Sequence, residues 1–471
     1  MFFNRKADIS IVYILIFLMI VGTFFRLYNL TYASLWFDEI HSMNGADPSS
    51  TLSDVYEYSK RDQPPLFFVI LHYWLKVFGY EDFAGRALTA FIGVLGIPAM
   101  YFLGKVYKNE KVGLFGAFMV TINWFHVDVS RDIRFYALVF LLTALSYMFF
   151  LLSVRKSNTS SFFWYTFFTS LLLNTHYFGL VVYLTQFVLF VIMMVWFRAD
   201  RSFIVKGLCS GLLTGLSIAH WFPVIFSDLQ IKSFHIQKIP QHFFIDYAWS
   251  YFKDPASFIL FAICAFLSAG YFYNRLKQRS IGIEHVIVFG WIFLSFFIPL
   301  LFSWIRYPML MERYSIIALP AIFLVITHGF YLIPNEKDRS YLVALVLVGA
   351  CLSLFVLNRI YKNILREDWR ETADFFAADT AKTVVFTPLT WYHRYYFMKN
   401  HLPLPMDHKQ VDISGIIKNK DHVWLLTHDY YIGPYNNPLF STQQQQLIDQ
   451  EFNLVDTVNF RQTHAYHYRR K

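Results

Sequence analysis

Two adjacent carboxylates, Asp38 and Glu39, are the residues of this sequence whose position most suggests chemistry. They follow the first apolar run and stand among the aromatic and aliphatic residues of segment 35–41. Neighbouring like charges repel unless a proton or a cation offsets one of them. A general base beside a metal ligand would account for both carboxylates. Asp38 could instead cap a following helix, because an aspartate side chain accepts hydrogen bonds from the first free backbone amides.

Two further polar islands interrupt the apolar sequence. Segment 61–65 opens with Arg61 and Asp62, and segment 128–136 contains Asp132 and Arg134. Paired carboxylates can deprotonate a hydroxyl and hold a divalent cation, whereas arginines bind phosphate oxygens bidentately. These are the groups that transfer from a lipid-linked phosphate requires. The arginines of segment 128–136 could instead be interface anchors whose side chains reach the lipid headgroups.

The composition assigns these residues to a membrane protein. The 471 residues are 56% hydrophobic and only 15% charged, which is more apolar than a water-soluble core of this length requires. The Lys and Arg residues that give the net charge of +9 are expected in cytoplasmic loops and at lipid headgroups. We therefore do not expect nucleic acid as a partner. The three cysteines lie far apart in apolar stretches, without a zinc-binding or disulfide spacing.

About eleven apolar runs are long enough to predict membrane-spanning helices. They lie at residues 9–25, 84–103, 112–125, 135–154, 162–173, 178–197, 207–226, 257–273, 283–304, 314–332 and 341–357. The first is expected to be an uncleaved helix, because no small-x-small cleavage site directly follows it. If the N-terminus lies in the cytoplasm, Lys and Arg gather in the loop after every even-numbered span, on the cytoplasmic side, as the positive-inside rule requires. The expected protein is a multi-pass protein of the cell (inner or plasma) membrane with an extracytoplasmic C-terminus.

The predicted fold is an α-helical polytopic membrane protein with a small C-terminal α/β domain. The membrane domain covers residues 1–357 and the soluble extracytoplasmic domain covers residues 358–471. Outer loops carry the candidate catalytic residues, and they are expected at 29–83, 126–134 and 227–256.

Local patterns predict several elements within these parts. The apolar stretch 66–78 is too short to cross and predicts a helix lying in the interface. In the soluble domain, residues 383–386 and 423–427 are predicted strands, and residues 369–376 and 391–398 are predicted helices.

Several motifs, in their order along the chain, resemble those of the polyprenyl-phosphate-dependent glycosyltransferases of the GT-C fold. The likeness is to glycosyltransferase family 39, the group of protein O-mannosyltransferases and bacterial aminoarabinose transferase-like enzymes, over about residues 9–357. It is carried by segment 26–41 with its acidic pair, by Pro64-Pro65-Leu66 with the later His72, by Asp132-x-Arg134-x-Tyr136, by Thr175-His176-Tyr177 and by Glu312-Arg313-Tyr314. Segment 367–370 resembles the start of the periplasmic domain of some bacterial members. The chain departs from the family pattern at Gln63, where members often have His, and at Arg131-Asp132, where they often have Gln-Glu.

The resemblance implies a role for each candidate residue. Asp38 would be the catalytic carboxylate, with Glu39 and Asp132 as helpers or metal ligands. Arg134, Arg313 and Arg61 would contact the phosphate of the donor. A divalent cation, the one cofactor expected, would be held by Glu39, Asp132 and His72. His72 and His176 could instead be packed, hydrogen-bonded histidines, since both stand among aromatic residues.

The expected function is that of an inverting glycosyltransferase of the cell envelope. It would move a hexose or pentose from a polyprenyl phosphate to an acceptor hydroxyl of a lipid, glycan or protein on the extracytoplasmic face. The chain has no GxxxxGK phosphate loop, which agrees with a lipid-linked donor in place of a nucleotide.

Two other classes of protein remain as alternatives. A multi-helix secondary transporter or lipid flippase also combines many helices with few charges, although here the charges gather in outer loops and no internal repeat is evident. A lipid-binding assembly partner would have no catalysis, and its acidic pair would be dispensable.

Overall fold

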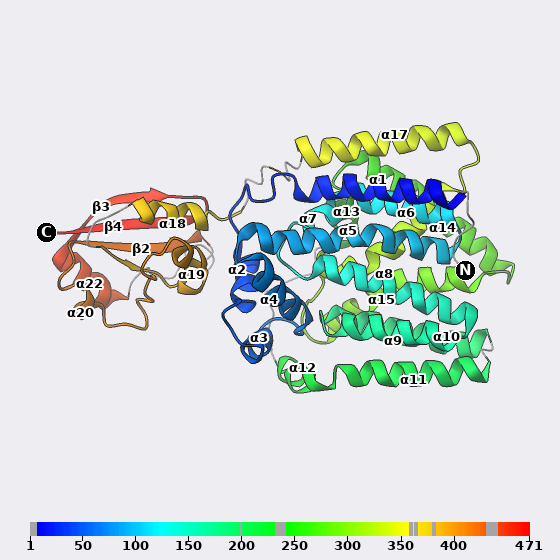
Figure 1. Ribbon diagram of the computed structural model, residues 1–471, viewed down its shortest axis with the longest axis horizontal. Coiled ribbons are helices and arrows are strands. Elements are labelled where there is room, and N and C mark those ends of the chain that lie inside the picture. Colours follow the sequence, from blue (N-terminus) through cyan, green and yellow to red (C-terminus); the bar gives the residue numbers. More distant parts are fainter. Residues whose placement is uncertain are drawn as a thin grey trace. The chain divides into compact units, whose positions relative to one another are not determined.

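The computed structural model describes residues 7–197, 200–230, 242–357, 361, 366–378, 383–429 and 441–471. The chain forms two compact units (Figure 1). Unit 1 comprises Met1–Tyr28, Pro48–Gly79 and Ala84–Tyr361, and unit 2 comprises Asn29–Asp47, Tyr80–Phe83 and Lys362–Lys471. The segment with Asp38 and Glu39 therefore belongs to the same unit as the C-terminal residues. The predicted boundary after residue 357 adjoins residues 358–360, which lie outside the described residues, and it stays a prediction.

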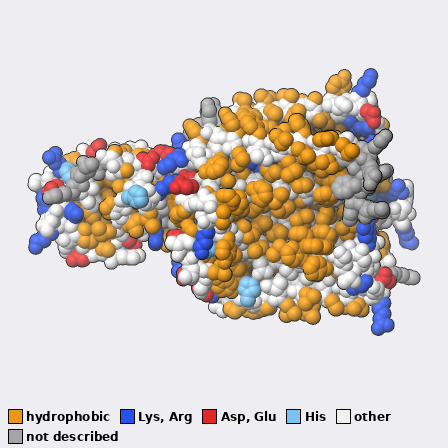
Figure 2. All heavy atoms as spheres, viewed as in Figure 1, with side chains coloured by type: hydrophobic (Ala, Val, Ile, Leu, Met, Phe, Trp, Pro, Cys, Tyr) orange, Lys and Arg blue, Asp and Glu red, His pale blue; other side chains and the backbone are white. Residues whose placement is uncertain are grey.

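Eight helices among the described residues are long and apolar enough to cross a membrane. They are α1 (Ala7–Leu27), α5 (Asp82–Tyr107), α8 (Tyr136–Lys156), α10 (Phe178–Trp196), α11 continued by η1 and α12 (Arg201–Ser217, Ala219–Trp221, Phe222–Asp228), α14 (Pro255–Lys277), α15 (Ile283–Ile305), and α17 continued by η3 (Glu336–Leu352, Ser353–Leu357). Figure 2 shows hydrophobic side chains over the sides of these helices, which is the surface that lipid tails solvate. The α-helical polytopic fold is confirmed.

Three of the eleven predicted spans form shorter helices. They are α6 (Glu110–Ile122), α9 (Thr159–Leu173) and α16 (Leu319–Phe330), the last preceded by the short helix η2 (Tyr314–Ala318). Within the predicted run 112–125, the Asn123 side chain accepts from the His126 amide and starts α7 (Trp124–Val129), so α6 ends at Ile122. Asn158 precedes the predicted run 162–173 and caps α9 by accepting from the Ser161 amide. Helices α6, α9 and α16 have 13, 15 and 12 residues.

Four further short helices lie in the first loop and in the loop after α12. They are α2 (Phe37–Gly45), α3 (Leu52–Ser59), α4 (Leu66–Phe78) and α13 (Phe243–Phe252). Helix α4 has the predicted bounds and buries Phe67, Leu71 and Leu75 on one face while Tyr73 and Val77 are exposed. This amphipathic pattern suits an interfacial helix, whose place in the membrane stays a prediction. In the predicted loop 227–256, residues 231–241 lie outside the described residues.

The C-terminal residues of unit 2 form a mixed sheet with helices, as predicted. Within the described residues the strand order is β1-β2-β4-β3, where β1 pairs with β2 in parallel and the other neighbours are antiparallel. The strands are β1 (Thr383–Phe386), β2 (His422–His428), β3 (Phe452–Asn459) and β4 (Thr463–Arg470), and the helices are α18 (Trp369–Ala378), α19 (Thr390–Lys399), α20 (Ile413–Ile417) and α22 (Thr442–Glu451). The two predicted strands and two predicted helices are confirmed, whereas β3, β4, α20 and α22 were not predicted.

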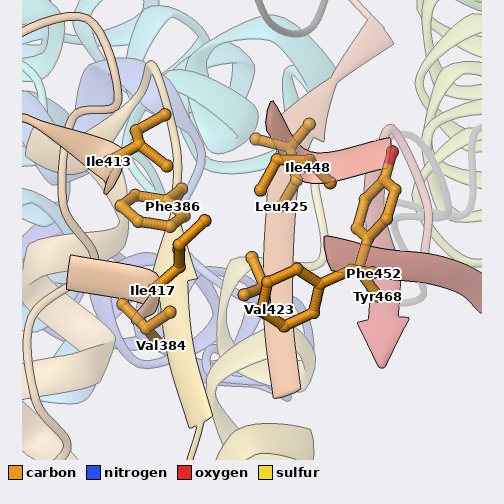
Figure 3. Packing of buried hydrophobic residues seen from close by; sticks show 9 residues of the cluster. All are labelled: Val384, Phe386, Ile413, Ile417, Val423, Leu425, Ile448, Phe452 and Tyr468. Carbon is orange, nitrogen blue, oxygen red and sulfur yellow. The ribbon is translucent and has the colours of Figure 1, made fainter. Parts of the chain in front are cut away.

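The core of this sheet is built from alternate strand residues (Figure 3). Val384 and Phe386 of β1 lie beside Val423 and Leu425 of β2, because side chains two residues apart point to the same face. Helices α20 and α22 cover this face, and their contributions to the cluster are Ile413, Ile417 and Ile448. This apolar core holds together the sheet of the unit that also contains α18 and α19.

Candidate functional site

The acidic pair occupies the first turn of α2 in unit 2. Glu39 is fully buried, and its Oε2 accepts from Arg366 Nη1 at 2.7 Å and from the Trp36 amide at 3.3 Å. Asp38 is only half-buried, and its backbone carbonyl accepts from the Ser42 hydroxyl at 3.0 Å. The N-cap position of α2 belongs to Trp36, so the capping alternative for Asp38 is not what the structure has. The two adjacent carboxylates thus differ: Glu39 is neutralised inside the unit, and Asp38 is the more accessible of the two.

A third carboxylate adds to this group. Burial raises the pKa of the Glu367 carboxyl to about 7; Arg366 opposes that shift, whereas the charges of Glu39 and Asp38 add to it. The Glu367 carbonyl also accepts a hydrogen bond from the Ser34 hydroxyl. The Glu367 carboxyl therefore lies in the field of Arg366, Glu39 and Asp38, and its raised pKa favours holding a proton on it.

Aromatic packing holds the start of α2. The Phe37 ring lies 4.2 Å from the Tyr392 ring, 4.7 Å from the His428 ring and 5.1 Å from the Trp369 ring, between ring centroids. Trp369 is fully buried and stacks on His428 at 5.4 Å. Burial lowers the pKa of His428 to about 4 and that of His393 to about 3, so both are neutral at pH 7. These rings pack against one another around the start of α2.

Asp82 ties separate segments of unit 2 together. Its carboxylate accepts from the Tyr395 hydroxyl at 2.8 Å, the Tyr396 hydroxyl at 2.7 Å and Lys399 Nζ at 3.2 Å. The Tyr396 hydroxyl in turn accepts from the Leu35 amide at 2.7 Å. Helix α19 therefore holds both segment 80–83, through Asp82, and the residues just before α2, through Leu35.

In unit 1 the main ion pair joins Asp62 and Arg134. Arg134 Nη1 lies 2.8 Å from Asp62 Oδ2 in an ion pair, and Nη2 donates a hydrogen bond to Oδ1 at 3.3 Å. The Arg134 side chain is 6% exposed and that of Asp62 is 17% exposed, and the guanidinium lies 4.5 Å from the Phe135 ring centroid. Asp132 is nearly buried, and its carbonyl accepts from the Arg134 amide at 2.6 Å. The turn before α8 thereby presents Arg134 to Asp62.

Arg131 supports the end of α1. Its Nη1 donates to the carbonyl oxygens of Arg26 and Tyr28, each at 2.8 Å, and its guanidinium lies 4.8 Å from the Tyr361 ring centroid. A cation at the C-terminus of a helix is stabilised by the carbonyl oxygens that accept no hydrogen bond within the helix. Arg131 is therefore a positioning residue for α1 in this fold.

The other two predicted phosphate-binding arginines are more accessible than Arg134. Arg313 is half-buried, with its guanidinium 5.8 Å from the Tyr136 ring centroid. Arg61 is exposed and lies 5.9 Å from the Tyr58 ring centroid. Next to Arg313, Tyr314 lies 5.3 Å from the His176 ring. A guanidinium group that is partly open to solvent beside an aromatic ring can bind phosphate oxygens.

The histidines of the motifs are packed side chains. His176 is buried, its Nδ1 accepts from the Phe178 amide at 3.0 Å, and burial lowers its pKa to about 3. His72 is 1% exposed on α4. Of the three predicted metal ligands, Glu39 lies in unit 2 and is paired with Arg366, whereas Asp132 and His72 lie in unit 1. Among the described residues, no three or more His, Cys, Asp or Glu side chains are arranged to hold a metal ion.

Comparison with known proteins relates this arrangement to a fold. Residues 62–222, which include Asp62 and Arg134, match the family model described as dolichyl-phosphate-mannose-protein mannosyltransferase. ArnT from Cupriavidus metallidurans in the apo state is similar over 98% of both chains, with a TM-score of 0.64 and 11% sequence identity. The chain has the GT-C fold.

Other GT-C structures are similar over nearly the whole chain. ArnT from Cupriavidus metallidurans bound to undecaprenyl phosphate has a TM-score of 0.59 and 11% identity, covering 97% of both chains. AglB from Archaeoglobus fulgidus, in complex with an inhibitory peptide and a dolichol-phosphate, has a TM-score of 0.56 and 11% identity, covering 98% of this chain and 74% of that one. A comparison with curated protein sequences gives no match. At this identity the likeness establishes the fold, which is that of a multi-pass membrane protein.

Sequence reasoning missed three residues of these sites. Asp82, Arg366 and Glu367 are buried or nearly buried and hold unit 2 together around α2. Asp62 was noticed only as part of a polar island, although it is the partner of Arg134. A signal existed for Glu367, since it opens the segment that resembles the family's periplasmic domain, but no spacing in the sequence links Asp62 to a residue 72 positions later.

Proposed function

We propose that this GT-C protein is an inverting glycosyltransferase that transfers a sugar from a polyprenyl phosphate to an acceptor hydroxyl on the extracytoplasmic face of the cell membrane. The observation that carries the proposal is the division within the acidic pair: Arg366 neutralises the buried Glu39, and Asp38 beside it is accessible. A half-buried carboxylate in an acid-rich setting is what a general base requires. The GT-C fold and the undecaprenyl phosphate bound by ArnT support the lipid-linked donor.

In the proposed reaction Asp38 accepts the proton of the acceptor hydroxyl. The acceptor oxygen attacks the anomeric carbon from the face opposite the phosphate, and the bond between that carbon and the phosphate oxygen breaks. The bonding electron pair leaves with the lipid phosphate, so the configuration at the anomeric carbon inverts. The Glu39–Arg366 pair holds the first turn of α2 and thereby orients Asp38.

Arginines balance the charge that gathers on the departing phosphate. Arg313 is the best placed by its own environment, because it is half-buried and rests on the Tyr136 ring. Arg134 is already neutralised by Asp62, so its part is to hold the local framework and share the phosphate once the donor is bound. Arg61 is exposed and meets the headgroup first. Preorganised cations of this kind stabilise developing charge without reorganisation.

A divalent cation on Glu39, Asp132 and His72 is the second way to balance the same phosphate charge. The residues do not present a ready group of metal ligands within the described part of the chain, and Arg366 competes for Glu39. Treatment with a chelator distinguishes the two: transfer that persists after EDTA supports the arginines, and transfer that is lost and then restored by Mn²⁺ supports the cation.

The test of the function is transfer of radiolabelled sugar from a panel of polyprenyl phosphosugars to membrane extracts. Purified wild type is compared with Asp38→Asn in the same detergent, and Asp54→Asn is the matched control because that exposed carboxylate only caps α3. We expect Asp38→Asn to lower transfer about 10²- to 10⁴-fold, the range for loss of a general base. Equal transfer by Asp38→Asn removes this residue from the mechanism. A folded wild type that transfers from no donor, and that changes solute or lipid movement across vesicles, favours the transporter.

A further inference from the structure

Four aromatic and histidine side chains converge at one end of the helices of unit 1, apart from the motifs used above. Tyr107 ends α5, Tyr271 lies in α14, His285 lies in the first turn of α15 and His328 lies in α16. The distance between ring centroids is 5.1 Å for the two histidines, 4.9 Å for Tyr271 and His328, and 5.7 Å for Tyr107 and His285. We name these four residues the Tyr–His cluster.

The polar atoms of the Tyr–His cluster are buried. Tyr107 and His328 are 1% exposed and His285 is 8% exposed. Among the described residues, the Tyr107 hydroxyl, both ring nitrogens of His285 and Nε2 of His328 have no hydrogen-bond partner. Buried polar groups nearly always have one, and leaving them without one costs stability. Several such atoms in one cluster therefore point to a bound polar group.

The charges around the cluster favour an anion. Lys108 follows Tyr107 directly, and its charge acts on both histidines. Arg275 Nε donates to the Tyr271 hydroxyl at 3.2 Å. Glu284 is the opposing charge, with its Oε1 3.8 Å from His285 Nδ1.

Two features of the same end of unit 1 add to this positive balance. Helix α15 begins here after Gly282, which gives no side-chain cap, so the positive end of its helix dipole is also present. Figure 2 shows Lys and Arg side chains at the end of unit 1 where Figure 1 marks the N-terminus.

The hydrogen-bond donors and acceptors of the cluster narrow the choice of ligand. The Ser268 hydroxyl donates to the Val325 carbonyl at 2.8 Å, so it accepts from His328 Nδ1 at 3.3 Å. A neutral His328 then carries its proton on Nδ1 and offers the lone pair of Nε2. A phosphate monoester that keeps one proton can donate that proton in a hydrogen bond to such a nitrogen. A phosphate diester has no proton to share.

We propose that the Tyr–His cluster binds the phosphate monoester headgroup of a membrane lipid. The cations Lys108 and Arg275 attract the phosphate, and the Tyr107 hydroxyl and one nitrogen of His285 donate to its oxygens. The lipid source follows from the surface beside the cluster, because α14 and α15 expose Phe266 and Phe293 as membrane-facing helices do. An acyl or prenyl chain can lie along these rings while its headgroup meets the cluster at the helix ends.

The test is native mass spectrometry of the full-length protein in detergent with added lipid. Phosphatidic acid is the monoester probe, phosphatidylglycerol is the diester probe and inorganic phosphate is the free anion. We expect wild type to retain phosphatidic acid about tenfold more than phosphatidylglycerol, and Tyr107→Phe and His328→Phe each to lower that retention about tenfold. Lys337→Gln is the control, since this exposed lysine starts α17 outside the cluster and its loss leaves retention unchanged.

Three results overturn the proposal. Equal retention of both lipids overturns the monoester, and full retention by Tyr107→Phe and His328→Phe overturns the site. Displacement of phosphatidic acid by an equal concentration of inorganic phosphate overturns the lipid source. Both substitutions keep an aromatic ring in place, and thermal unfolding of each variant shows that the fold is kept.

Discussion

In unit 1, Asp62 and Arg134 form an ion pair with one hydrogen bond, whereas in unit 2 Arg366 acts on Glu39 and Glu367 while Asp38 stays half-buried nearby. The first arrangement balances charge and suits a framework. In the second, burial and the charges of Glu39 and Asp38 raise the pKa of the Glu367 carboxyl. On this comparison we propose the general base in unit 2 and the phosphate-binding arginines, chiefly Arg313, in unit 1.

The largest effect is expected from removing Arg366, the partner of the buried Glu39. Arg366→Met leaves Glu39 buried without its ion pair, and breaking a buried pair lowers the free energy of unfolding by about 3–5 kcal/mol. Thermal unfolding followed by tryptophan fluorescence measures this change. The double variant Glu39→Gln/Arg366→Met is expected to recover much of the loss, because no buried charge remains alone.

Arg394→Met is the matched control for that substitution, because Arg394 is an exposed arginine of α19. A loss in Arg366→Met no larger than in Arg394→Met would show that the pair contributes nothing to unit 2.

A smaller effect is expected from opening the ion pair of unit 1. Asp62→Asn and Arg134→Gln are each expected to lower the free energy of unfolding by about 3 kcal/mol, since each leaves a poorly solvated partner. The double variant is expected to lose less than the sum, with a coupling of about 1–3 kcal/mol in a double-mutant cycle. Strict additivity of the two single losses would contradict the Asp62–Arg134 ion pair.

The smallest effect is a pH dependence that only the acid-rich group should show. The pKa of Glu367 is raised from 4.5 to about 7 in the folded protein, so the folded state binds the proton more tightly than the unfolded state. Its contribution to stability is complete below pH 4.5, falls as the pH rises to about 7 and is flat above it. We expect a loss of about 2 kcal/mol over this window, allowing for the partial solvation of the carboxyl.

Glu367→Gln removes the titrating group and should flatten this part of the stability curve. Asp374→Asn is the control, because Asp374 is exposed and accepts only a surface hydrogen bond from Asn400 at 2.8 Å. An unchanged slope in Glu367→Gln would assign the pH dependence to other groups.

The sequence predicted most elements of the fold because lipid imposes a simple pattern. Apolar length and basic turns indicated the long helices, and the bounds of α4 and β1 were predicted to the residue. Asn123 ends α6 within the predicted apolar run 112–125, so that run is divided between α6 and α7. Strands β3 and β4 were missed because polar residues dominate them, so they lack the apolar run that marked β1 and β2.

The candidate site was predictable in residue type and less so in pairing. Asp38 and Glu39 were found from their adjacency, but their different environments depend on Arg366, more than 300 residues later. Likewise the partner of Arg134 is Asp62, which no local spacing indicates. Long-range ion pairs are set by tertiary packing, and a single sequence does not record them.

The most direct test of the central claim separates donor binding from transfer in Asp38→Asn. Binding of the polyprenyl phosphosugar and its single-turnover transfer are measured on the same purified protein, with Asp54→Asn as the control. The account predicts donor affinity within about twofold of wild type and a transfer rate lower by about 10²- to 10⁴-fold, because Asp38 acts on the acceptor proton and not on the phosphate. Transfer at the wild-type rate, or a loss of donor affinity that accounts for all of the lost transfer, would contradict the assignment of Asp38 as the base.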